Sequence, residues 1–276
     1  MSIKKIIQSN QFLYWFVRQE RKIQYYLIPI TRFHVKRFMR KHGLLKNEYI
    51  EKIKEFKNKH VSDRCFIVAT GPSLTVKDLE KLRGEITIGM NSISKIGEKT
   101  DWRPTYYGVQ DLAVYKKLKN SIKSFDKNIS IFISSSIAKR EKLTGENIIQ
   151  MPIYGMNHLI NPNADNIIFS GDCYDVIYDG YSITYSLLQL ATYMGFKEIY
   201  LIGADCSYAK QGPQHFIETG VVDPYAHIAG ERMLRSYRVA KEYTDKHGIK
   251  IYNATRGGYL ELFERVNMDD IKFKPF

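Results

Sequence analysis

The sequence predicts an α/β protein with a doubly wound, mostly parallel sheet, preceded by a basic helical segment. From Cys65 onward, short apolar runs alternate with helical patterns, which is typical of parallel strands joined by crossover helices. The first of these runs ends in the loop Gly71-Pro72-Ser73. Residues 1–60 differ from the rest in charge and texture. We therefore expect a basic amphipathic helical segment over 1–60 and an α/β domain over 61–276.

The composition is that of an ordinary globular protein, with 44% hydrophobic and 26% charged residues. No apolar run reaches the roughly 18 residues of a membrane-spanning helix. The N-terminus lacks the apolar stretch and the small-residue cleavage site of a signal peptide. The three cysteines are too few and too scattered for a disulfide framework or a zinc site. We therefore expect a cytoplasmic protein.

The net charge of +13 is concentrated at the N-terminus. Residues 1–60 carry 15 Lys and Arg against 4 Asp and Glu, whereas the remaining residues are almost neutral. A nucleic-acid-binding surface across the α/β domain is therefore not predicted. On both sides of Pro29 the segment mixes aromatic residues with cations, as in Phe12–Arg18 and Phe33–Lys41. Such helices could pack on the α/β domain, lie on the inner face of the plasma membrane, or serve a homo-oligomer, and nucleic-acid binding is the weakest alternative.

The expected elements follow one another in a regular alternation. Residues 65–70 are expected as a buried strand, and Leu74–Leu82 as a short helix capped by Ser73 or Thr75. Further strands are expected at residues 86–90, 104–110, 129–133, 198–203 and 250–254, and further helices at 182–194 and 231–247.

Polar residues follow the expected strands where each strand ends. Ligands of open parallel sheets bind beyond the carboxyl ends of the strands, so these residues are predicted to converge on a site. They are Thr70, Gly71, Pro72, Ser73, Asn91, Ser92, Gln110, Asp111, Ser134–Ser136, Asp205 and Asn253.

Three of these positions suggest particular chemistry. Gly71 lets the backbone approach a ligand closely, and the following helix start offers amides to an anion. A tight turn without a ligand would show the same pattern. Asp111 and Asp205 suit a ribose hydroxyl, a base amino group or Mg²⁺, and equally a helix cap or a surface turn.

The segment 203–230 is long and shows no obvious long element. It contains Tyr208, His215, Tyr225 and His227, and loops of this length are usually functional or disordered. It is predicted to be an active-site lid in which His227 or His215 is the general base, although a structural or solvated histidine is the alternative. Protease and zinc-enzyme motifs are absent from the sequence.

Four segments of the sequence resemble two related families. They are Phe66–Leu74, Thr87–Ser92, Gly195–Asp205 and Ile249–Asn253. One family is the family-42 bacterial sialyltransferases, and the other is the MptE-type 6-hydroxymethylpterin pyrophosphokinases. The resemblance implies a Rossmann-like sheet that is a variant of the GT-A architecture.

The resemblance to the sialyltransferases implies a glycosyltransferase of bacterial surface polysaccharide synthesis. The donor would be a CMP-sugar or another nucleotide-sugar, the acceptor a glycan or a lipid-linked glycan, and no metal would be required. The residues implied at the nucleotide are Thr70, Gly71, Pro72, Ser73, Asn91 and Asp205. Tyr208 and Tyr225 would assist the departing phosphate, and His227 would be the base. Ser182 and Thr184 stand where that family has a Thr-Ser-Gly turn at the donor, so the chain departs from the pattern there.

The resemblance to the pyrophosphokinases implies an ATP- and Mg-dependent diphosphotransferase, in which Asp111 and Asp205 would hold Mg²⁺. A nucleotide-binding protein without turnover is a third hypothesis. Asp111 favours the pyrophosphokinase-like alternative, whereas the 195–205 segment and the histidine-bearing segment favour the glycosyltransferase.

Overall fold

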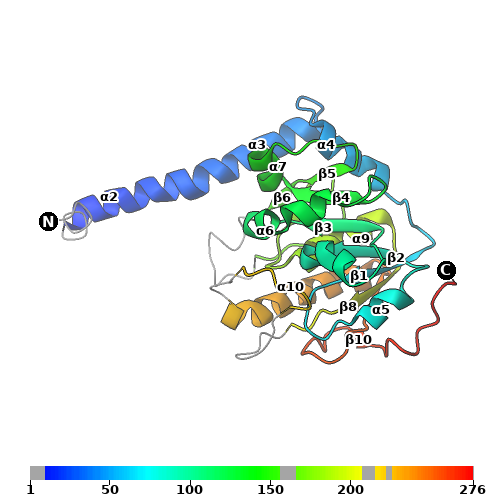
Figure 1. Cartoon of the computed structure of the whole chain (residues 1–276). Helices are drawn as coiled ribbons and strands as arrows, with labels where there is room; N and C mark the ends of the chain where they lie inside the picture. Colours follow the sequence, from blue (N-terminus) through cyan, green and yellow to red (C-terminus); the bar gives the residue numbers. More distant parts are fainter. Residues whose placement is uncertain (1–9, 156–165, 207–214, 222–225, 276) are drawn as a thin grey trace. The chain divides into compact units, whose positions relative to one another are not determined.

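The computed structural model describes residues 10–155, 166–206, 215–221 and 226–275 (Figure 1). The chain divides into two compact units, one formed by residues 1–46 and 154–166, the other by residues 47–153 and 167–276. The second unit contains the sheet. Its strands are β1 (Arg64–Val68), β2 (Ile86–Met90), β3 (Tyr106–Val109), β4 (Ser130–Ser134), β5 (Ile148–Met151), β8 (Glu198–Ile202), β9 (Lys250–Asn253) and β10 (Glu264–Arg265).

These eight strands form one sheet in the order β10-β9-β8-β1-β2-β3-β4-β5, and all their pairings are parallel. The predicted α/β fold with a parallel sheet is confirmed. From β1 the chain adds β2 to β5 in one direction and then returns to place β8 on the other side of β1. The strand order therefore reverses between β1 and β8. A further pair, β6 (Ile153–Tyr154) and β7 (Ile177–Tyr178), forms a small separate sheet.

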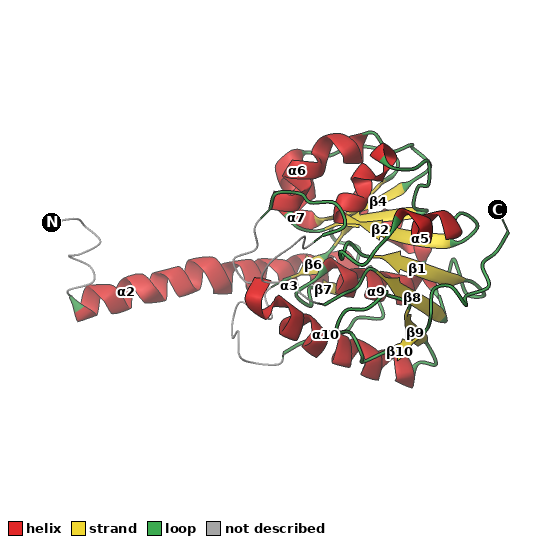
Figure 2. Cartoon of the chain, turned by 60° about the horizontal axis from the view of Figure 1, so that its bottom comes forward, coloured by secondary structure: helices red, strands yellow, loops and turns green. Residues whose placement is uncertain are grey.

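Helices cover both faces of the large sheet (Figure 2). Helices α9 (Ile183–Met194) and α10 (Ala226–Lys246) lie on one face, and α5 (Val76–Lys81), α6 (Leu112–Lys123) and α7 (Ser135–Glu141) on the other. Strand β1 shows the consequence, because Phe66 and Ile67 point to opposite faces and both have no exposed surface. Burial on both faces explains why this strand is a continuous apolar run.

The helical segment before the sheet has two parts. In the first unit, α2 (Gln11–Lys22), the π-helical turn η1 (Ile23–Leu27) and α3 (Ile28–Lys41) follow one another without a break. Pro29 therefore lies inside a continuous helical run, and the π-helical turn immediately before it, in which the Ile28 amide donates to the Ile23 carbonyl, is where the α-helical hydrogen-bond pattern is interrupted. In the second unit, α4 (Glu48–Glu51) and the 3₁₀ helix η2 (Lys52–Phe56) precede β1. Within the described residues, no helix has both the length and the apolar character needed to cross a membrane.

Several boundaries differ from the expectations. Helix α10 begins at Ala226, so the expectation of no long element over 203–230 is wrong at its C-terminal end. Ser135 and Ser136 were expected in a strand-end loop but begin α7, because the Ser134 hydroxyl accepts the amide hydrogen of Ile137. Of the two candidate caps of α5, Thr75 is the N-cap and forms a reciprocal capping box with Asp78.

Candidate functional site

The loop after β1 is tied to the end of β8, at the point where the strand order reverses. The Gly71 amide donates to the Gly203 carbonyl at 2.8 Å. The amide and the hydroxyl of Ser73 both donate to the Asp205 carboxylate, at 3.3 and 2.8 Å. Ligands of doubly wound sheets bind in the crevice at such a reversal, beyond the carboxyl ends of the strands. Two expected site segments, Thr70–Ser73 and Asp205, are therefore brought together where this rule places a ligand.

Gly71 is required by this contact. A Cβ atom at that position would lie 1.8 Å from the Oδ2 atom of Asp205 and 2.5 Å from the Gly203 carbonyl oxygen. Asp205 itself is only 7% exposed. Burial raises the pKa of its carboxyl group, and the two hydrogen bonds from Ser73 partly oppose that shift. The site thus contains a buried carboxylate whose ionisation is disfavoured by its surroundings.

The first turns of helix α10 pass close to the residue after Asp205. A Cβ atom on Gly230 would lie 2.6 Å from the carbonyl oxygen of Cys206, so the first turns of α10 pass against the residue after Asp205. Cys206 has a φ of +51°, an uncommon value for a residue with a side chain. His227 lies in the first turn of α10, three residues before Gly230. The side chain of His227 lies outside the described part of the structure.

The other residues of the expected lid are only partly described. The amide of Phe216 donates to the Thr70 carbonyl at 2.8 Å, so the residue after His215 is joined to the end of β1. The amide of His215 donates to Glu218 at 2.9 Å. Tyr208 and Tyr225 lie outside the described residues.

The strand-end residues farther along the sheet have structural partners. Asn91 has a φ of +46°, and its carbonyl accepts the Tyr107 hydroxyl at 2.7 Å. Ser92 is buried, with 1% of its surface exposed. Asp111 is the N-cap of α6 and accepts the Val114 amide hydrogen at 2.9 Å. Of the two interpretations of Asp111, a ligand-binding carboxylate or a helix cap or turn, the structure shows the helix cap.

The turn that enters α9 also carries two expected site residues. Ser182 is the N-cap of α9 and accepts the Tyr185 amide hydrogen at 3.3 Å. Thr184 is buried, and its hydroxyl lies 3.5 Å from the Met90 sulfur at the end of β2. The start of α9 is therefore at the carboxyl edge of the sheet, but the Thr184 hydroxyl points into the core.

Gln110 was expected at this edge, but its pairing with Asp179 was not predicted from the sequence. The Gln110 amide oxygen accepts the hydroxyl hydrogen of buried Ser186 at 2.7 Å, and its nitrogen lies 3.4 Å from Asp179. Asp179 also accepts the amide hydrogen of Tyr181, whose φ is +66°. Because Gln110 and Asp179 are 69 residues apart, no local pattern in the sequence indicates this pairing.

Comparison with known proteins decides the family. The model of the family described as 6-hydroxymethylpterin diphosphokinase MptE-like matches residues 36–211. That match covers more than half of the chain. The chain belongs to the MptE-like family.

The solved structures add a likeness of fold. The MAf glycosyltransferase from Magnetospirillum magneticum AMB-1 superposes on this MptE-like chain with a TM-score of 0.53 and 15% sequence identity. The alignment covers 84% of this chain and 40% of that protein, so the chain spans less than half of its length. At this identity the likeness shows a shared α/β fold. No curated protein matches the sequence.

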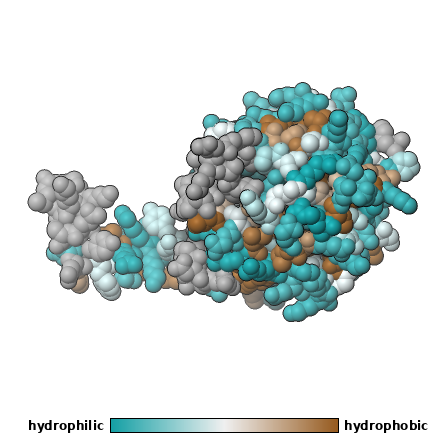
Figure 3. Space-filling view, turned by 90° about the horizontal axis from the view of Figure 1, so that it is seen from below, coloured by the Kyte–Doolittle hydropathy of each residue, from teal (hydrophilic) through white to brown (hydrophobic). Residues whose placement is uncertain are grey.

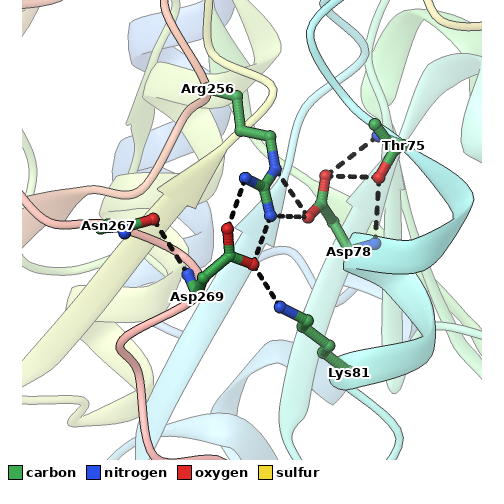
Figure 4. A network of polar contacts seen from close by, with 6 residues as sticks. All are labelled: Thr75, Asp78, Lys81, Arg256, Asn267 and Asp269. Atoms are coloured by element: carbon green, nitrogen blue, oxygen red, sulfur yellow. Dashed lines mark hydrogen bonds and ion pairs between the residues drawn. The ribbon is translucent and has the colours of Figure 1, made fainter.

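A guanidinium group at the same edge is already bound by carboxylates (Figure 4). Arg256 follows β9 and donates to Asp78 of α5 at 2.8 and 2.9 Å and to Asp269 at 2.7 and 2.8 Å. Lys81 also contacts Asp269. These hydrogen bonds raise the pKa of Arg256 and lower that of Asp269. The group joins α5 to the C-terminal segment of this MptE-like chain, and Arg256 could meet a phosphate only by leaving these partners.

The two carboxylates of the magnesium hypothesis lie apart in the sheet. Asp205 follows β8 and Asp111 follows β3, and β1 and β2 lie between those strands. Three strand spacings amount to about 14 Å, whereas Mg²⁺ binds its oxygens at about 2.1 Å. One ion therefore cannot contact both side chains in this arrangement. Across the ranges that the structure describes, no group of three or more His, Cys, Asp or Glu residues is arranged to hold a metal.

A cavity of about 350 Å³ opens at the opposite edge of the sheet. It lies at the amino ends of β1 and β8 and is lined by residues 61–64, Lys197, Glu198 and Lys274. This cavity does not include the strand reversal at the carboxyl edge. It therefore provides an internal comparison for any ligand-binding experiment on the chain.

Proposed function

We propose that this MptE-like chain is a cytoplasmic transferase that binds a nucleotide at the carboxyl edge of its sheet. The observation that supports it is the Thr70–Ser73 loop held against Asp205 at the reversal between β1 and β8. Because the Gly71 and Ser73 amides already donate to Gly203 and Asp205, a nucleotide would meet this loop through the side chains of Thr70 and Ser73. The nucleotide would be held by Thr70–Ser73, Asn91 and Asp205, with Ser92, Asp111, Ser182 and Thr184 around it.

The preferred reaction is transfer of a sugar from a nucleotide-sugar, as in a sialyltransferase, onto a glycan or lipid-linked acceptor of bacterial surface polysaccharide. An acceptor hydroxyl would attack the anomeric carbon and lose its proton to His227, while the nucleotide phosphate leaves. Tyr208 and Tyr225 would donate hydrogen bonds to that phosphate, with His215 nearby. The start of α10 beside Cys206 supports this role for His227. The likeness to a solved glycosyltransferase supports the choice of reaction.

The alternative is transfer of diphosphate from ATP to a hydroxymethyl group, which is the activity in the family's description. The match over residues 36–211 favours this reaction. The distance between Asp111 and Asp205 weighs against a magnesium ion shared by these two residues, so the metal would need other ligands, such as the phosphates of ATP. A nucleotide-binding protein without turnover would need the same crevice and no base.

A thermal-shift series with CMP, CDP, UDP, GDP and ATP, each with and without Mg²⁺, separates these functions. Stabilisation by CMP or CDP without metal is the expected result. A response to ATP only with Mg²⁺ would support the diphosphotransferase instead. Binding of any of these nucleotides without transfer of either group would support the non-catalytic protein. The absence of a response to every nucleotide would contradict the proposed site.

A further inference from the structure

Helices α2, η1 and α3 leave large apolar side chains exposed. Phe12 is 72% exposed, Tyr25 62%, Phe38 59%, and Trp15 and Phe16 are each 56% exposed. These fractions leave most of each side chain uncovered by the residues that the structure describes. Isolated exposed apolar residues are common on soluble proteins, but a row of aromatic residues along one helical segment marks an interaction surface.

The apolar and basic residues of α2 occupy neighbouring faces. Phe12, Trp15 and Phe16 have the i, i+3, i+4 spacing that places them on one side of the helix. Arg18, Arg21 and Lys22 repeat the same spacing and form an adjacent stripe. Residues 10–46 contain nine Lys and Arg against one acidic residue, and this balance favours an anionic partner. Figure 3 shows the resulting mixture of hydrophobic and hydrophilic atoms along this segment.

We propose that α2, η1 and α3 bind the surface of an anionic phospholipid bilayer and lie parallel to its plane. Aromatic rings favour the boundary between headgroups and acyl chains, where the apolar face of an interfacial helix is buried by about 5–10 Å. Lys and Arg beside that face meet the lipid phosphates. A second copy of this basic helix fits less well, because it would bring like charges together. The inference rests on this surface and does not depend on the nucleotide site.

The two tryptophans of the chain provide a direct measurement. Trp15 is 56% exposed, whereas Trp102 is 2% exposed in the core of the other unit. Vesicles of phosphatidylcholine with phosphatidylglycerol are therefore expected to shift the emission of the full chain to shorter wavelength and to protect it from acrylamide. The Trp15→Phe variant should still float with these vesicles but should lose the spectral shift. Vesicles of pure phosphatidylcholine should bind the chain far more weakly.

Charge substitution gives a matched pair of variants. Each basic residue near an anionic surface strengthens binding roughly fivefold. The triple variant Arg18→Gln, Arg21→Gln, Lys22→Gln should therefore lower the vesicle partition coefficient by about a hundredfold. The control replaces three exposed lysines of α6 with glutamine, which changes the net charge by the same amount. These are Lys116, Lys117 and Lys123.

Three outcomes would overturn the proposal. One is failure of the full chain to float with anionic vesicles. Another is an equal loss of binding in the α2 and α6 variants, which would show a nonspecific charge effect. A third is Trp15 emission that is already blue-shifted and protected from acrylamide without lipid. Sedimentation velocity would then show whether a second copy or the chain's own α/β unit covers the face.

Discussion

Substitution of Gly71 tests whether the loop after β1 is held against Asp205 as the structure shows. In Gly71→Ala the new Cβ atom would lie 1.8 Å from the Asp205 carboxylate, where contacts below 3.0 Å are essentially never found. The carboxylate would have to retreat by about 1.2 Å, away from the Ser73 hydroxyl that binds it at 2.8 Å. The Gly203 carbonyl, at 2.5 Å, belongs to the backbone and cannot rotate away.

The magnitude follows from two costs. Overpacking of a closely fitted site costs about 1–3 kcal/mol. Weakening the hydrogen bonds from Ser73 to a carboxylate costs about 1.5–3 kcal/mol. The variant should lose about 3–5 kcal/mol of unfolding free energy, which corresponds to a fall of about 10 °C in Tm for a domain of this size. Nucleotide binding should fall as well, because the loop that carries Thr70 and Ser73 is displaced.

Differential scanning calorimetry with a matched control decides the result. Gly97→Ala makes the same chemical change where the nearest atoms belong to the flexible end of Arg103, so its Tm should stay within about 2 °C of the parent. If Gly71→Ala unfolds within the same 2 °C, the loop is not packed against Asp205 and the described site is wrong.

Three further predictions concern the same unit. Burial raises the pKa of Asp205 above 3.8, so its protonated form stabilises the fold at low pH, and this contribution is lost as the pH rises through the raised pKa. In urea unfolding, the stability of Asp205→Asn relative to the parent should therefore increase between pH 4 and pH 8. A stability difference that does not vary with pH would refute this reasoning. His227→Ala should abolish sugar transfer from the nucleotide-sugar and leave nucleotide affinity unchanged in calorimetry; unchanged transfer would remove His227 from the role of base. Arg256→Ala should lose about 2 kcal/mol of unfolding free energy in urea, because the buried Asp78 carboxylate loses its cation. The loss is moderate because the guanidinium is itself partly exposed to solvent. Equal stability of variant and parent would show that this cluster does not hold the C-terminal segment.

Much of the sheet could be predicted because its signals are local. The run before Gly71 is apolar on both faces because helices cover both faces of β1, and that pattern is visible in the sequence. Gly195, with a φ of +94°, ends α9 where the sequence predicts its end. The convergence of Thr70–Ser73 with Asp205 could also be predicted, since both follow parallel strands.

Other features could not be predicted because they depend on distant segments or on competing local signals. Strand β8 lies beside β1 because the chain returns across the sheet through α9. Neither strand carries a sequence pattern that indicates this pairing. Gln110 and Asp179 are 69 residues apart and meet only in the folded chain. For Asp111, a cap and a ligand-binding carboxylate have the same sequence signature, and only the contact with Val114 shows the capping role. Strand β5 was missed because it has only four residues and its apolar run is interrupted by Gln150.

Hydrogen exchange with and without nucleotide tests the central claim most directly. The nucleotide that gives the largest thermal shift should slow exchange at the amides of residues 69–75 and 203–206, at the carboxyl edge of the sheet. Residues 61–64, 197 and 198, which line the cavity at the opposite edge, should exchange at an unchanged rate. Protection of the 61–64 segment with no change at 69–75 would contradict the account, because the nucleotide would then bind at the wrong end of the strands.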